Sequence, residues 1–584
     1  MRVSLHLSLA LAGAVLGIAG VVGRGPSRAA VSGSGLPAER REGGFISSGA
    51  CRACHPSQYA SWYASYHRTM TQAASRQAAI PSFRSQTVAD VQGGPMRLSE
   101  RGPQLWAEFD DPDSSEPAGH RPRITRQVTL ITGSHNQQIF WYATGAGRML
   151  GQLPGAYLVS ERRWIPRRMA VLHPPTQQPL SETGHWNSTC LACHTTNGVP
   201  GFDTPFGSQP IGAQRPDTTV AEFGIACESC HGPGLTHARA NQNLARRYQL
   251  HLTGGRDDTI IQPADLSPRL ASQVCGQCHS VWEFYTSADE HAANVGGLPF
   301  RPGDELARTR FVAQPTVNAD SPTMQALLAD DSRFIRDAFW SDGIVRVSGR
   351  EYNGLIESPC YRDATSQERT LSCLSCHVLH RKDDDPRTLQ LWADDQLTAA
   401  PHSAAAPGTD ADNAACLQCH PALRANLTAH THHPAESSGS SCYNCHMPYT
   451  TYGLLRALRS HQIESPTVAT SVNTGRPNGC NLCHLDKPLA WTANHLSEWF
   501  QQPVPKLSED EQQLSAAALW ALSGDAGQRA IVAWNMGWAP AIEASGGDWM
   551  PPILTQLMQD NYEVIRRIGR SEEHTSELQS PYVI

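Results

Sequence analysis

The sequence predicts a mainly α-helical and irregular fold, in which short helices and loops surround eight covalently bound haem groups. Three observations lead to this prediction. The pattern Cys-x-x-Cys-His occurs eight times in 584 residues. Glycine and proline are abundant, with 47 and 41 residues, and they interrupt regular periodicity. The eight patterns follow each other at no fixed period, which argues against a solenoid of repeated units.

Each of these pentapeptides has the spacing that c-type haem attachment requires. Two thiols three positions apart lie on one side of a helical turn, where they can bind the two vinyl groups of one haem, and the next histidine ligates the iron. A zinc site has no use for a histidine after every second cysteine, and a redox disulfide would not recur eight times. We number the motifs one to eight in chain order: Cys51, Cys54 and His55; Cys190, Cys193 and His194; Cys227, Cys230 and His231; Cys275, Cys278 and His279; Cys373, Cys376 and His377; Cys416, Cys419 and His420; Cys442, Cys445 and His446; Cys480, Cys483 and His484.

The motifs use sixteen of the seventeen cysteines, so the sequence predicts no disulfide framework. Cys360 is the remaining cysteine. We expect a buried and inert thiol there, since nothing near it in the sequence argues for a lowered pKa. A thiolate ligand to iron is the alternative.

The histidines outside the motifs are numerous enough to supply a second, distal ligand to most or all of the irons. A histidine close to one motif cannot easily reach the far face of the same haem, so we expect it to ligate a neighbouring haem. For each of them the alternative is a surface or hydrogen-bonded imidazole, which we expect at His173, His251, His291 and His495. We expect distal ligands at His67, His135, His237, His380, His402, His432, His433 and His461, with His430 as a further candidate in the same cluster as His432 and His433.

The first 29 residues have the pattern of a secretory signal peptide. Met1-Arg2 precedes an apolar run over residues 3–22, and small residues lead to an expected cleavage site after Ala29. The run is almost long enough to span a bilayer, so an uncleaved membrane anchor is the alternative. Both alternatives export the remaining chain, and we expect a periplasmic or extracellular location.

Residues 30–500 form the expected haem-bearing region. Within it, residues 123–160 predict a small β insertion, because two β-rich runs flank a Gly-Ser-His-Asn turn at residues 133–136. The gap between motifs four and five predicts a helix near residues 324–339.

Residues 501–569 predict a helical segment. Ser508 and Glu511 form the sequence of a capping box before a helix over residues 512–522, and residues 552–558 and 562–568 predict a helical pair. Residues 570–584 are similar to the in-frame translation of a sequencing-library adapter, so we leave them out of the fold prediction. We expect them to pack against nothing and the natural chain to continue differently after Gly569.

Several stretches resemble the exported multihaem cytochromes c that are related to the tetrahaem carrier of ammonia oxidisers. This family is described by a cytochrome c-552/4 domain or a doubled CxxCH motif. The resemblance implies bis-histidine haems in stacked pairs that pass electrons, and residues 560–566 are similar to part of a HEAT repeat. The stretches are Cys51 to His67, Trp186 to Cys190, Glu222 to His237 and Cys442 to Pro448.

The sequence therefore favours an electron carrier over a catalyst. Two imidazoles per iron, without a methionine sulfur, predict low reduction potentials. We expect redox partner proteins, such as other cytochromes or a membrane quinol-linked donor, and no nucleic acid, because the net charge is −7 and no nucleic-acid motif is present.

Two alternatives stay open. An octahaem oxidoreductase of the nitrite, hydroxylamine or tetrathionate type would leave one haem open for substrate, although the Cys-x-x-Cys-Lys that some of these enzymes use is missing from the sequence. A filament-forming structural cytochrome would use histidines to bridge subunits.

Overall fold

The computed structural model describes residues 35–89, 91, 93–117, 119–170, 183–204, 209–210, 213–362, 370–397 and 408–577, with the backbone alone at residues 395 and 572–577. The predicted signal peptide, His173, His402 and residues 578–584 lie outside the described residues. Within the described parts of the chain, we find no helix whose length and apolar character would let it cross a membrane.

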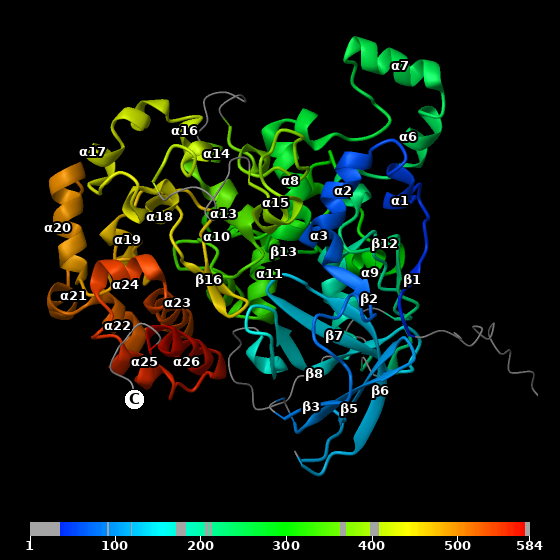
Figure 1. Ribbon diagram of the computed structural model, residues 1–584, viewed down its shortest axis with the longest axis horizontal. Helices are drawn as coiled ribbons and strands as arrows, with labels where there is room; N and C mark the ends of the chain where they lie inside the picture. The colour runs from blue at the N-terminus through cyan, green and yellow to red at the C-terminus, as the bar shows by residue number, and fades with distance from the viewer. Residues whose placement is uncertain are drawn as a thin grey trace, which may run out of the picture. The chain divides into compact units, whose positions relative to one another are not determined.

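A sheet of eight strands lies between motifs one and two (Figure 1). Its strand order is β3-β4-β5-β6-β7-β8-β9, every neighbouring pair is antiparallel, and β2 pairs with the far end of β6. The strands are β2 (Thr71–Ala73), β3 (Gln86–Val88), β4 (Met96–Arg101), β5 (Gln104–Asp110), β6 (Arg123–Thr132), β7 (Gln137–Ala143), β8 (Leu150–Leu158) and β9 (Arg163–Pro166).

The sheet buries both of its faces along β8, where every residue is buried. On one face, Leu153 joins an apolar core that the sheet builds with its own strands and loops. On the other face, Leu150 packs with Trp186 and Leu191, which flank the first cysteine of motif two. The sheet therefore carries the second haem motif on its outer face.

The predicted β insertion was too small. The expected range 123–160 contains β6, β7 and β8, but the sheet begins at Thr71 and ends at Pro166. Strands β4 and β5 expose charged residues on alternate positions, and only their buried positions show the period of two: Met96 and Leu98 in β4, and Leu105, Ala107 and Phe109 in β5. This signal was present in the sequence, and it extends the β region well beyond the predicted range.

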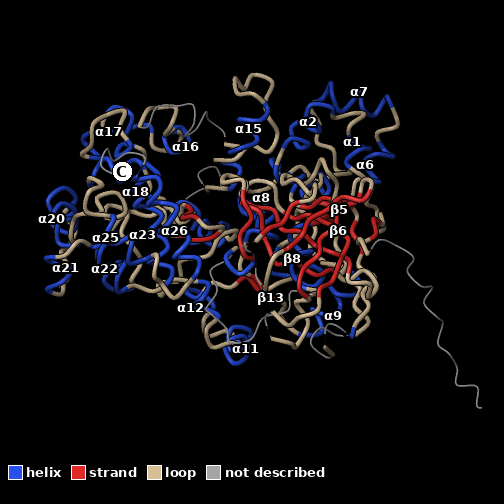
Figure 2. Tube along the Cα trace, turned by 60° about the horizontal axis from the view of Figure 1, so that its bottom comes forward, coloured by secondary structure: helices blue, strands red, loops and turns tan. Residues whose placement is uncertain are grey.

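Outside the sheet, the haem-bearing region consists of short helices, loops and two-stranded ribbons (Figure 2). The ribbons pair β1 (Ala38–Glu39) with β11 (Thr219–Val220), β10 (Thr195–Thr196) with β12 (Glu222–Phe223), β13 (Trp282–Glu283) with β14 (Phe311–Val312) and β15 (Thr451–Gly453) with β16 (Arg456–Leu458). The helices are α1 (Ser48–Cys51), α2 (Pro56–Ala64), α3 (Tyr66–Thr69), α4 (Leu191–His194), α5 (Cys227–His231), α6 (Leu235–Ala240), α7 (Leu244–Thr253), α8 (Pro268–His279), α9 (Ser287–Gly296), α10 (Pro315–Asn318), α11 (Pro322–Asp330), α12 (Phe334–Ala338), α13 (Glu351–Glu357), α14 (Pro359–Arg362), α15 (Leu389–Asp395), α16 (Ala414–Leu417), α17 (Leu427–Thr431), α18 (Cys442–His446), α19 (Val468–Thr474) and α20 (Leu489–Phe500). The helix predicted near residues 324–339 is divided into α11 and α12 by the turn at residues 331–333.

Six helices follow α20, and α22 to α26 share one large apolar core with the segment around motif eight. They are α21 (Glu509–Gln513), α22 (Ala516–Ser523), α23 (Ala526–Met536), α24 (Ala539–Ser545), α25 (Pro551–Leu557) and α26 (Glu563–Glu577). The capping box forms at Ser508. The predicted helix over residues 512–522 is interrupted, because Ser515 caps a new helix by accepting from the Ala518 N–H. The predicted pair corresponds to α25 and α26, and α26 runs past Ile568.

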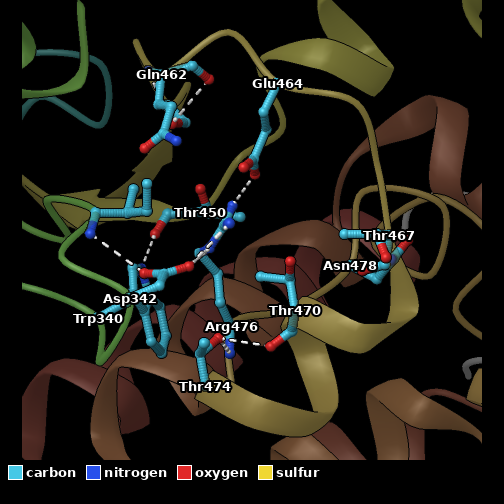
Figure 3. A network of polar contacts seen from close by, with 12 residues as sticks. Trp340, Asp342, Thr450, Gln462, Glu464, Thr467, Thr470, Thr474, Arg476 and Asn478 are labelled. Atoms are coloured by element: carbon cyan, nitrogen blue, oxygen red, sulfur yellow. Dashed lines mark hydrogen bonds and ion pairs between the residues drawn. The ribbon is translucent and has the colours of Figure 1, made fainter. Parts of the chain in front are cut away.

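A buried arginine just before motif eight joins the segment between motifs four and five to the segment between motifs seven and eight (Figure 3). The Arg476 guanidinium bonds the Asp342 carboxylate at 3.0 and 3.2 Å and also forms an ion pair with Glu464. The side chain of Arg476 is 4% exposed, so its two acidic partners supply the charge that its burial requires.

Candidate haem sites

Each motif is built on one helical turn. Motifs three, four and seven lie in α5, α8 and α18, and motif two runs from the π-helix Trp186–Cys190 into α4. In the four other motifs the histidine N–H donates to the carbonyl of the first cysteine: His55 to Cys51 at 2.9 Å, His377 to Cys373 at 2.9 Å, His420 to Cys416 at 3.0 Å and His484 to Cys480 at 2.8 Å. This i to i−4 bond places both thiols and the imidazole on one side of the turn.

A cavity of about 1070 Å³ runs among motifs two to six. Cysteines of all five motifs line it, together with His67 and His461. Burial lowers the pKa of His67, His194 and His377 to about 4, which keeps the imidazoles in the neutral form that ligates metal. A large cavity bounded by thiols and neutral imidazoles fits haem, which would be held by the cysteines covalently and by the histidines through iron.

Six motif histidines face a second imidazole across a gap of constant width. A metal–nitrogen bond of about 2 Å on each side, with about 1 Å from each nitrogen to its ring centre, separates two axial imidazole centres by about 6 Å. The observed pairs have this separation. They are His55 with His237 at 6.1 Å, His67 with His279 at 6.5 Å, His231 with His380 at 6.3 Å, His377 with His461 at 6.5 Å, His430 with His446 at 6.2 Å and His433 with His484 at 6.0 Å.

Five of the predicted distal ligands take part in these pairs. Each faces the histidine of a motif that is not its nearest motif in the sequence. His237, six residues after motif three, faces motif one, and His380, three residues after motif five, faces motif three. His67, His433 and His461 face motifs four, eight and five.

Two predicted ligands lie elsewhere. His135 stacks on Tyr66 with ring centres 4.1 Å apart, and His432 stacks on Trp499, also at 4.1 Å. His430, not His432, faces motif seven. The sequence offers no sign of this choice, because it depends on the end of α17: His432 follows the helix with a φ of 56°, and this left-handed residue turns its ring away from the helix.

Motifs two and six have no facing imidazole within the described ranges, and His173 and His402 lie outside those ranges. Cys360 is half-buried, and burial raises the pKa of its thiol. It borders the same cavity as the cysteines of motif six.

The family described as "cytochrome c554 and c-prime" matches residues 50–92 and 170–232, which contain motifs one to three. A search among curated proteins gave no match. Among solved structures, the outer cell wall cytochrome OcwA is 16% identical with a TM-score of 0.46, over 91% of this chain and 99% of that chain. An undecahaem cytochrome from the S-layer of Carboxydothermus ferrireducens is 12% identical with a TM-score of 0.34, over 92% of this chain and 69% of that chain.

The motifs, the facing imidazoles and the family match agree. Together they support a multihaem cytochrome c. A protein of this kind holds haem covalently and transfers electrons.

Contacts between motifs order the haem sites of the cytochrome. Sulfur atoms of two different motifs meet at four places, and in each free thiol pair the contact raises the pKa of one cysteine and lowers that of the other. The contacts are Cys51 with Cys227, Cys193 with Cys278, Cys275 with Cys373 and Cys416 with Cys442. These contacts place motif one beside motif three, two beside four, four beside five and six beside seven.

Three further close approaches join neighbouring motifs, so that the motifs form a row. The Gln277 side chain of motif four donates to the Ser229 carbonyl of motif three at 2.9 Å. The Gln418 side chain of motif six donates to the Ser375 carbonyl of motif five at 3.0 Å. A Cβ at Gly479, just before motif eight, would lie 3.5 Å from the Cys445 carbonyl of motif seven. The sites therefore follow the order 1-3-4-5-6-7-8, with site two beside site four.

Proposed function

We propose that the protein is an exported octahaem cytochrome c that transfers electrons along bis-histidine haems. The observation that carries this proposal is the set of six imidazole pairs, with ring centres 6.0 to 6.5 Å apart, over six of the eight motifs. Two imidazoles fill both axial positions of an iron, which leaves electron transfer as its chemistry and no position for substrate.

The row of sites supports conduction through the length of the haem-bearing region. Haem supplies the one-electron chemistry when it is bound. The chain's own residues fix the spacing: sulfur contacts hold neighbouring porphyrin edges together, and the short helices keep both imidazoles in place. Motif one, whose Cys54 and His55 are exposed, and motif eight are the two ends of the row, where partners would exchange electrons.

We assign the distal ligands as His67, His237, His380, His430, His433 and His461, which face the histidines of motifs four, one, three, seven, eight and five. The described residues support no distal ligand for motifs two and six, and His402 stays a prediction from the sequence. This assignment replaces the predicted ligands His135 and His432, whose rings stack on Tyr66 and Trp499.

Export is part of the proposal because c-type haem is attached outside the cytoplasm. The pattern of the first 29 residues supports either a cleaved signal peptide or a membrane anchor, and a periplasmic or extracellular location follows from both. The partners would be other redox proteins, including a membrane quinol-linked donor where the anchor is retained.

Intact-mass and EPR measurements on exported protein test the proposal. We expect a mass increment of eight haems and an oxidised EPR spectrum that is low-spin throughout. A high-spin signal from one haem, with turnover of nitrite, hydroxylamine or tetrathionate, would instead indicate the oxidoreductase. Filaments in negative-stain images that dissolve when surface histidines are replaced would indicate the structural cytochrome.

A further inference from the structure

The proximal histidine of motif four differs from those of motifs three and seven in the hydrogen bond of its Nδ1. Its Nδ1 lies 2.7 Å from the Glu351 Oε2. The other oxygen of this carboxylate accepts from the Gly349 N–H at 3.0 Å, and Glu351 stands in the first turn of α13, where the helix dipole favours a negative charge.

Two other proximal histidines bond to uncharged groups. The Nδ1 of His231 in motif three lies 2.8 Å from the Ile261 carbonyl, and the Nδ1 of His446 in motif seven lies 2.8 Å from the Glu464 carbonyl. A carbonyl fixes the orientation of the ring but brings no net charge.

A second carboxylate approaches an iron ligand, but it is neutralised. Asp257 lies 3.3 Å from the Nδ1 of His237, the imidazole that faces motif one. Arg246 donates to this carboxylate at 2.8 Å, and Asn241 donates to it as well. Among the described residues, no arginine or lysine forms an ion pair with Glu351, so a net negative charge stays beside His279.

Site four is also the branch of the row, since it adjoins sites two, three and five. The helix that carries Glu351 is held there by close packing. A Cβ at Gly276 of motif four would lie 2.9 Å from the Tyr352 ring, and a Cβ at Gly354 would lie 2.8 Å from the backbone of His461, the imidazole that faces motif five. With glycines at both contacts, α13 fits between the ligands of two irons and keeps the carboxylate fixed.

We propose that Glu351 is a positioning residue that lowers the reduction potential of haem four below those of its neighbours in the row. A carboxylate on Nδ1 draws the proton away from the ring, makes the imidazole a stronger donor and stabilises ferric over ferrous iron. An electron then crosses the branch without residing there and moves on to site two, three or five. This inference rests on the proposed function, because it requires haem at motif four.

The same site carries its own spectroscopic signature. The rings of His67 and His279 cross at 75°, whereas the other five facing pairs lie within 5° to 28° of parallel. Crossed imidazole planes give a low-spin ferric EPR signal at larger g than the rhombic signal of parallel planes. Haem four can therefore be followed separately from the five near-parallel pairs.

An EPR-monitored redox titration of the full-length holoprotein tests the inference. We expect the large-g signal to persist to lower potential than the rhombic signals of the near-parallel pairs. Loss of the large-g signal before the rhombic signals would overturn the proposal. A haem count of eight by mass is measured on the same sample, so that failure of the proposed function is seen as missing haem and failure of this inference as a shifted order of reduction.

The variant Glu351→Gln tests the carboxylate itself. We expect the midpoint potential of the large-g signal to rise, with the rhombic signals unchanged. The matched control is Glu357→Gln in the same helix: Glu357 is also buried, but its carboxylate bonds Gln314, Thr316 and Arg362. Equal shifts in the two variants would contradict the proposal. If Glu351→Gln yields no holoprotein, Glu351→Asp is measured, and its potential should lie above that of the wild type because the shorter side chain bonds His279 less closely.

Discussion

The haem-bearing middle of the chain and the helical region after motif eight differ in what fills their cores. The helices α22 to α26 contribute most of the largest apolar cluster among the described residues, with fully buried Leu554 and Ile565 in it. The described residues around motifs three to five form two small clusters, and this region borders a cavity of about 1070 Å³ whose lining includes cysteines and histidines. We infer that side chains form the core of the helical region and that haem forms the core of the middle region.

Removal of a haem from the middle region should unfold much more of the protein than removal of a haem from an end of the row. Site four adjoins three other sites, whereas site one adjoins site three alone, so the double variant Cys275→Ser with Cys278→Ser should lose far more structure than Cys51→Ser with Cys54→Ser. We expect the motif-one variant to be exported with seven haems, and the motif-four variant to be degraded or to carry fewer than seven. For both variants, intact mass gives the number of haems and thermal unfolding gives the melting temperature. Equal melting temperatures for the two variants would show that haem is not the core of the middle region.

A buried ion-pair network within the haem-bearing region should come next in effect. Arg476→Met leaves the carboxylates of Asp342 and Glu464 without their shared cation, and breaking a buried ion pair costs about 3 kcal/mol. Glu464 also accepts from the Nδ1 of His446 through its carbonyl, so the spectrum of haem seven should change with stability. Arg336→Met serves as the control, because that side chain is 71% exposed. A chemical denaturation curve that moves equally for both variants would contradict this role.

A cavity in the helical core should destabilise that region without touching the haems. Leu554→Ala removes a fully buried side chain, and such truncations cost about 2 to 5 kcal/mol. Leu522→Ala on α22 is the control, since Leu522 is 56% exposed. Far-UV circular dichroism should report the loss, while the haem absorption spectrum stays that of the wild type. A changed haem spectrum in Leu554→Ala would show that the two regions are not independent.

The smallest effect concerns an ion pair near motif five. The hydrogen bonds from the buried Arg387 outweigh burial and lower the pKa of Asp385. A lowered pKa stabilises the fold above the unfolded value of about 3.9, and this stability is lost as the pH falls through the folded value. Wild type should therefore be more stable than Asp385→Asn at pH 7, and the gap should narrow as the solution is acidified below about pH 4. Asp384→Asn, at an exposed neighbouring position, should show no such gap.

The sequence predicted the motifs and five of the six imidazoles that face them, because both depend on local spacing. Each motif spans about one helical turn. His237 and His380 each lie too close in sequence to one motif to reach the far face of that motif's haem. The choice of His430 over His432 depends on where α17 ends, and the ring of His135 is fixed by Tyr66 from another element. The extent of the sheet was missed for a different reason: β4 and β5 are short, and half of their residues are polar.

The helical region shows the same limit. The capping box at Ser508 was read correctly, but the break at Ser515 depends on two bonds to the segment after motif eight. The Ser515 hydroxyl donates to the Leu485 carbonyl at 2.6 Å, and the Ala516 N–H donates to the Lys487 carbonyl at 3.0 Å. Tertiary contacts of this kind leave no local pattern in the sequence.

The account depends most on the claim that facing imidazoles ligate the irons, and one pair of variants tests it directly. His430 faces His446 at 6.2 Å, and His432, two residues later, stacks on Trp499. EPR spectra of oxidised His430→Ala and His432→Ala, each with eight haems by mass, should differ by one iron. We predict one new high-spin haem in His430→Ala and a wholly low-spin spectrum in His432→Ala. A high-spin haem in His432→Ala, with none in His430→Ala, would contradict the account.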